Sequence, residues 1–193
     1  RDIDRAVEHA AATGDLELVE GLVARHGGAY FTRGLNATVE KWLDLFPPEH
    51  ISRSPGLSAL QAIKALHRGD GALSLRWTSA LDEAVEPFGG TGELPITWWP
   101  SILHAALDQK PARELLGLVT PARERLRHGP WAGFACWVEG SLSFLAGDLD
   151  QAREMLELGV FEGQVADSPL VSSDCDATRS ILEHFALDAS VSE

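Results

Sequence analysis

The sequence predicts an all-α fold in which antiparallel helix pairs stack into an α-α superhelix. Apolar residues recur at i, i+3 and i+4 along most of the 193 residues, and no stretch sustains the period of two that strands require. Short turns, several with a Gly-Asp pair, separate the amphipathic stretches. Turns at positions 34, 69, 108 and 147 lie 35, 39 and 39 residues apart, a period typical of helix-pair solenoids. We therefore expect one helical-repeat domain over residues 1–193, with an irregular helical domain as the alternative.

The clearest helix pair lies in residues 131–158. Its apolar stripes predict helices over 131–145 and 149–160, joined at Gly147-Asp148. Gly147 suits the left-handed position after the first helix, and Asp148 can cap the second, with Gln151 placed to complete a capping box. Comparable junctions precede other apolar stripes, at Gly14-Asp15, Arg33-Gly34, Gly69-Asp70 and Leu107-Asp108.

The amino-terminal half contains several further helices. Apolar spacing predicts them over 3–10, 16–23, 29–32, 35–46, 55–66 and 73–88. The stretch 26–28, His-Gly-Gly, is expected to end the second, and Pro47-Pro48 to stop the fourth before a loop to Arg53. Ser54-Pro55 supplies a serine cap and a proline at the first helical position of the next.

The remaining helices are predicted over 97–107, 111–126 and 169–185. Pro121 should kink or split the second of these near Thr120. The stretch 89–95, GGTGELP, follows a helix and lacks the Gly-Lys-Ser/Thr ending, so it indicates a linker and not a phosphate loop. The last helix follows Ser168-Pro169 and departs from the Gly-Asp pattern, as expected of a cap or of a truncated repeat.

Two stretches carry a family resemblance. Residues 3–70 run through a helix pair, an Arg-Gly turn, a helix ending in WLDLFP, a Ser-Pro start and a helix ending in Gly-Asp, and residues 129–160 read GPWAGFACWVEGSLSFLAGDLDQAREMLELGV. This order resembles the tetratricopeptide-like helical-repeat region of the large ATP-binding LuxR-type (MalT-like) transcriptional regulators, up to about Val165. The resemblance implies that the chain is a fragment of a multidomain regulator, with a nucleotide-binding switch domain before it and a DNA-binding helix-turn-helix after it.

Composition excludes several classes of function. No apolar run has the eighteen or so residues of a membrane span, and no leader for export opens the sequence, so we expect a cytoplasmic location. The formal net charge is −13, and residues 129–193 hold two arginines against twelve carboxylates. Such a surface repels phosphate, so we expect no direct nucleic-acid binding by this segment. An acidic face that is merely solvated and a docking surface for a basic partner both remain open.

The sequence shows no catalytic or metal-binding pattern. The seven histidines lack paired ligand spacing, and Gly140 to Phe144 falls one glycine short of a nucleophile elbow and lies in a predicted helix. Cys136 and Cys175 are expected to be small buried hydrophobes, with a disulfide as the less favoured alternative. We therefore predict no enzyme activity, no cofactor and no metal.

Six tryptophans are the compositional hint of a binding surface. Trp42 and Trp77 fall in register with core stripes. Four others, on helices expected to line the inner face of the superhelix, could form an aromatic wall, with polar contacts from two further residues: the candidate site is Trp98, Trp99, Trp131, Trp137, His104 and Glu139. Two adjacent tryptophans do not both point into one core, so one of Trp98 and Trp99 should face the groove.

Two functions fit these patterns. The first, implied by the resemblance, is a sensor and protein-interaction solenoid that receives a small inducer or a partner protein and relays it to the ATPase and DNA-binding domains of the same regulator. The second is a stand-alone tetratricopeptide-like scaffold that binds peptide segments of partner proteins in its groove. A domain that regulates a fused kinase or cyclase has the same physical requirements.

Overall fold

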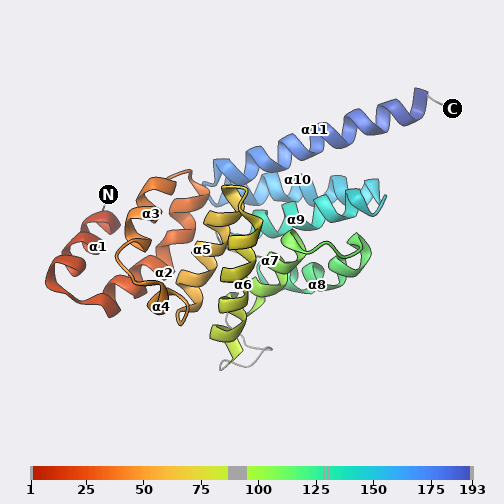
Figure 1. Cartoon of the computed structure of the whole chain (residues 1–193). Coiled ribbons are helices and arrows are strands. Elements are labelled where there is room, and N and C mark those ends of the chain that lie inside the picture. The colour runs from red at the N-terminus through yellow and green to blue at the C-terminus, as the bar shows by residue number, and fades with distance from the viewer. Residues whose placement is uncertain (1, 87–94, 128, 130, 192–193) are drawn as a thin grey trace. The chain divides into compact units, whose positions relative to one another are not determined.

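The computed structural model of the chain describes residues 2–86, 95–127, 129 and 131–191. Within these ranges every regular element is a helix and none is a strand, which confirms the all-α prediction. The chain divides into two compact units, unit 1 over Arg1–Leu107 and unit 2 over Asp108–Glu193 (Figure 1). Each is described by itself below. The expectation of a single superhelical domain over residues 1–193 stays a prediction.

Unit 1 is a run of helices in which neighbours along the chain pack together. Within the run, α1 packs on α2, α2 on α3 and α5, α5 on α6, and α6 on α7. Its core contains fully buried aliphatic side chains from successive helices, among them Val23, Leu57 and Leu81. The elements are α1 (Asp2–Thr13), α2 (Leu16–Thr32), α3 (Asn36–Leu43), α4 (Pro48–Ile51), α5 (Pro55–His67), α6 (Gly71–Val85), the 3₁₀ helix η2 (Pro95–Trp98) and α7 (Trp99–Leu107).

Unit 2 contains four long helices, α8 (Ala112–Arg125), α9 (Ala132–Leu145), α10 (Leu149–Val165) and α11 (Pro169–Val191). α9 packs against α8, α10 and α11, and α10 also packs against α11. In Figure 1 the three helices α9, α10 and α11 lie side by side. A core shared by consecutive helices in this way is the local arrangement expected of stacked helix pairs.

The glycine turns between helices form as predicted. Gly14, Gly34, Gly69 and Gly147 have positive φ values between 73° and 83°. At each, the N–H of the next residue donates to the carbonyl five residues before it, at 2.9–3.1 Å. These bonds satisfy carbonyls left open at the end of the preceding helix. A fifth turn has the same bond after Asp167, whose φ is 52°: the N–H of Ser168 donates to the carbonyl of Gly163 at 2.7 Å, so the start of α11 follows the pattern although its sequence does not.

The aspartates after three of these glycines cap the next helix. The side chains of Asp15, Asp70 and Asp148 accept hydrogen bonds from backbone N–H groups three residues on, at 3.0–3.1 Å. Ser54 caps α5 in the same way through the N–H of Leu57. The helix starts predicted from these residues are therefore confirmed.

Three predicted boundaries are wrong. The stretch 26–28 does not end a helix, because α2 continues to Thr32 and both of its glycines are buried. A β-carbon on Gly27 would lie 2.5 Å from Leu60 Cδ1, so this glycine serves close packing against α5 and not a turn. The expected loop after Pro47 contains the short helix α4. The helix predicted over 111–126 forms as α8 and begins at Ala112, but it is not split near Thr120, because it runs unbroken past Pro121.

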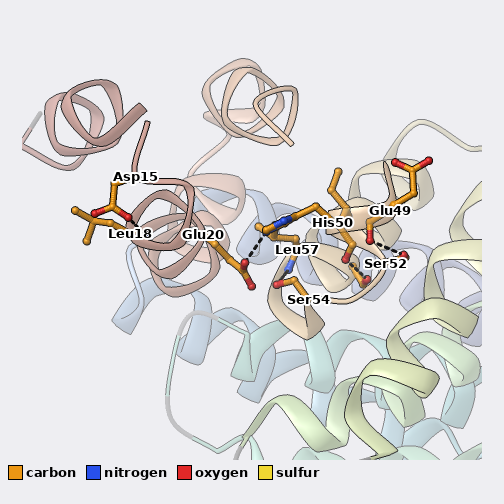
Figure 2. A network of polar contacts seen from close by, with 10 residues as sticks. Asp15, Leu18, Glu20, Glu49, His50, Ser52, Ser54 and Leu57 are labelled. Carbon is orange, nitrogen blue, oxygen red and sulfur yellow. Dashed lines mark hydrogen bonds and ion pairs between the residues drawn. The ribbon is translucent and has the colours of Figure 1, made fainter. Parts of the chain in front are cut away.

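The loop expected around α4 is held by polar contacts that join it to its neighbours (Figure 2). His50 on α4 points toward α2, and its Nε2 lies 2.6 Å from Glu20 Oε2. Ser58 on α5 donates a hydrogen bond of 2.8 Å to the buried carbonyl of Ile51. These contacts, together with the burial of Ile51, fix the path of the chain between α3 and α5.

Glycines allow an unusually close approach of α9 to α10. A β-carbon on Gly133 would lie 2.9 Å from the Gly159 carbonyl oxygen and 3.1 Å from the Gly163 nitrogen. On α10, a β-carbon on Gly159 would lie 3.3 Å from the Gly133 carbonyl oxygen. Backbone therefore contacts backbone along this seam, and larger residues at these positions would push the helices apart.

Candidate functional site

The two adjacent tryptophans of unit 1 have different surroundings. Trp99 begins α7 and is 4% exposed, whereas Trp98 ends the 3₁₀ helix and is half-buried. Trp98 is thus the member of the pair that a ligand could reach, and Trp99 belongs to the core of unit 1.

His104 lies on α7 and faces α6. Its Nε2 is 2.8 Å from Asp82 Oδ2, and both side chains are partly exposed. The pair links two helices at the surface of unit 1, so any ligand that used His104 would have to share it with Asp82.

The two candidate tryptophans of unit 2 share one aromatic neighbour. The Phe134 ring lies 5.5 Å from that of Trp137 and 6.3 Å from that of Trp131. Trp137 also donates from Nε1 to Thr178 Oγ1 on α11, at 3.0 Å. Both tryptophans remain half-buried, with part of each ring accessible. The structure therefore brings Trp131 and Trp137 into one cluster.

Glu139 is a buried anchor between two helices. It is 2% exposed and accepts hydrogen bonds from Thr120 Oγ1 at 2.9 Å and from Arg123 Nε. Thr120 and Arg123 lie on α8, so this one carboxylate joins α8 to α9. Because both carboxylate oxygens already accept hydrogen bonds from α8, Glu139 holds α9 against α8, and neither oxygen is free to bind a ligand. The sequence contained a signal for this burial, because Glu139 is the one charged residue in the apolar segment 131–145.

The four tryptophans fall into two groups. Trp98 and Trp99 belong to unit 1, while Trp131 and Trp137 belong to unit 2. A continuous aromatic wall formed by all four stays a prediction.

Unit 2 has an open apolar surface that the sequence did not indicate. Leu145, Ile181 and Phe185 lie in the apolar stripes that predicted the helices over 131–145 and 169–185, but they are 73%, 52% and 58% exposed. Phe185 on α11 lies against Phe144 on α9, with ring centroids 5.9 Å apart. Large exposed apolar groups on adjacent helices are typical of surfaces that bind another molecule.

The two cysteines are unreactive packing residues. Both are buried and free, and both lie close to the position that a β-carbon on Gly159 would take, with Cys175 Sγ 2.6 Å and Cys136 Cβ 3.3 Å from it. Burial raises the pKa of each thiol to about 12, because the thiolate would be poorly solvated there. The prediction that they behave as small hydrophobes is confirmed.

A shallow hollow of about 470 Å³ lies at the turn between α9 and α10 and is lined by Arg113, Gly147, Asp148, Leu149, Asp150 and Arg153. Its charges are mixed, and Arg153 is already paired with Asp150 and Glu183. None of the predicted site residues lines this hollow.

The described residues contain neither a group of metal ligands nor a membrane-spanning helix. Within residues 2–86, 95–127, 129 and 131–191, no three His, Cys, Asp or Glu side chains are grouped so that they could hold a metal ion. Over the same part of the chain, no helix is both long and apolar enough to cross a membrane.

Comparison with protein-family models, with curated proteins and with solved structures finds no match to this chain. The resemblance to the MalT-like repeat region therefore rests on the order of sequence features alone and stays a prediction.

Proposed function

We propose that this chain is a helical-repeat binding module that acts as the sensor and protein-interaction part of a LuxR-type (MalT-like) transcriptional regulator. The observation that carries the proposal is the repeated junction, in which a left-handed glycine ends one helix and an aspartate caps the next. It occurs in both units, at Gly14-Asp15, Gly69-Asp70 and Gly147-Asp148. Repeated helix pairs present long surfaces for recognition.

In this proposal the accessible aromatic residues bind the inducer or partner. Trp98 is the candidate contact of unit 1, and Trp137 with Phe144 and Phe185 is that of unit 2. The binding would be relayed to ATPase and DNA-binding domains outside the segment. The segment itself would neither bind DNA nor hydrolyse a nucleotide.

The alternative function is a stand-alone tetratricopeptide-like scaffold that binds peptide segments. The open apolar surface around Ile181 and Phe185 favours it, because exposed helix faces suit a protein segment better than a small molecule, which prefers a concave pocket.

A thermal-shift screen of the 193-residue chain against metabolites and amphipathic peptides tests the proposal. We expect at least one compound or peptide to raise the melting temperature of the wild-type protein, since binding to the folded state alone stabilises it. The Trp98→Ala variant should keep the fold. If the binding site is in unit 1, the ligand should no longer raise the melting temperature of the Trp98→Ala variant.

Trp99→Ala is the matched control for Trp98→Ala. Because Trp99 is buried, its truncation should lower the free energy of unfolding by about 3–5 kcal/mol through the cavity it leaves. If Trp98→Ala and Trp99→Ala lower the free energy of unfolding equally, by the amount expected for a core residue, then Trp98 is a core residue and not a ligand contact. Salt-sensitive DNA binding or ATP hydrolysis by the purified chain would contradict the proposal as a whole.

A further inference from the structure

Helix α10 presents an apolar stripe on the side opposite to its packed face. Phe161 and Val165 are 59% and 68% exposed, and Leu158, which is half-buried, precedes Phe161 by three residues. At 100° per residue these three side chains lie within about 60° of one another around the helix. The packed face, which includes Ala152, Leu156, Gly159 and Gly163, is centred on the opposite side.

Carboxylates flank this stripe on both sides. Glu157 precedes Phe161 by four residues on one edge, and Glu162 follows it on the other. Arg153 is the only basic residue in the sequence of α10, and its guanidinium is engaged by Asp150 at 3.2 Å and by Glu183 at 2.8 Å. No basic side chain of α10 is therefore left to balance the glutamates beside the stripe.

The spacing of these apolar residues is that of one helix in a two-helix coiled coil. With Leu158 and Val165 as a positions, Phe161 is a d position, and Glu157 and Glu162 become g and e positions. Apolar a and d residues bury against a partner helix, and charged e and g residues select the charge of that partner.

We propose that this face of α10 binds an amphipathic helix of a separate protein, whose apolar residues are spaced three and four apart and are flanked by lysine or arginine. A second copy of this chain would place glutamates against glutamates, which is unfavourable. The inference rests on the proposed function as a binding module and names the class of partner. The seam spans only about 10 Å between Leu158 and Val165, so the flanking charges should matter and binding should weaken with salt.

A pair of synthetic peptides tests this inference with the whole 193-residue chain. Each has three heptads with leucine at a and d; one has lysine at every e and g position and the other has glutamate there. Fluorescence anisotropy of labelled peptide should show tighter binding of the lysine peptide. Phe161→Ala should weaken that binding about tenfold, and Glu157→Lys combined with Glu162→Lys should reverse the preference between the peptides.

Leu118→Ala is the control, because Leu118 is an exposed apolar residue of the same unit, 41% exposed, but lies on α8. It should leave binding of the lysine peptide unchanged. Equal binding of the two peptides, no binding of either, or an equal loss in the Phe161→Ala and Leu118→Ala variants would overturn the inference. Self-association of the wild-type chain that Phe161→Ala abolishes would also overturn it, because the occupant would then be a second copy. A ligand found in the thermal-shift screen that is insensitive to Phe161→Ala would leave the proposed function intact, so the two failures are distinguishable.

Discussion

Replacing Gly133 by alanine should destabilise unit 2, although alanine is the better helix former. The added β-carbon would lie 2.9 Å from the Gly159 carbonyl oxygen, 3.1 Å from the Gly163 nitrogen and 2.7 Å from Val171 Cγ1. Two of these atoms belong to the α10 backbone, which moves only if the whole helix shifts. Overpacking of this kind costs about 1–3 kcal/mol, and we expect the upper part of that range because the contacts are to backbone.

Gly117→Ala is the matched control on α8 of the same unit. A β-carbon at Gly117 meets nothing within 4 Å, and the position is exposed in the interior of the helix. The gain in helix propensity alone should therefore stabilise the protein by about 0.5–1 kcal/mol. The same gain offsets part of the loss at Gly133, so we expect a net loss of about 2 kcal/mol there.

Urea denaturation followed by circular dichroism measures both changes. The two glycine-to-alanine substitutions should shift the midpoint in opposite directions, with little change in the m value. A Gly133→Ala variant as stable as Gly117→Ala would refute the reasoning, because it would mean that α9 and α10 do not touch through their backbones.

Three further predictions concern single residues. Glu139→Ala should cost about 3–5 kcal/mol in the free energy of unfolding, because it leaves the mostly buried Arg123 without its partner; urea denaturation should show that Glu139→Leu combined with Arg123→Met recovers most of the loss. Gly147→Ala should lower the free energy of unfolding by about 1–2 kcal/mol through its φ of 83° alone, since no atom lies within 4 Å of the added carbon; an unchanged melting temperature would contradict this. Cys136 and Cys175 should resist a thiol reagent at pH 8 until urea is added, because their pKa values near 12 leave about one thiol in ten thousand ionised. Since burial raises these pKa values above that of the unfolded chain, the stability that the thiols contribute is complete below about pH 8.5 and is lost as the pH rises toward 12, which denaturation at several pH values would show.

The sequence was sufficient where the determining contacts are local. The turn at Gly147 depends on residues within one helical turn, so it could be predicted correctly. The helix end predicted at Gly27 failed because a glycine chosen for close approach to Leu60 has the same sequence signature as one chosen for a left-handed turn. The burial of Glu139 and the exposure of Phe185 could not be predicted for a related reason: sequence spacing gives the direction in which a side chain points but not whether another helix covers it.

The contacts of α9 with α8 and with α10 have different consequences for the order in which unit 2 opens. Along α10 the contact is dense and continuous through Gly133 and Gly159, so separating these helices exposes backbone and core together. Along α8 the contact includes Arg123 and Glu139, whose desolvated charges offset part of what they gain from each other. Native-state hydrogen exchange should therefore find the amides of α8 released in openings smaller than those that expose α9 and α10. A first helix that detaches while the other three stay folded would let this unit open in steps and not all at once.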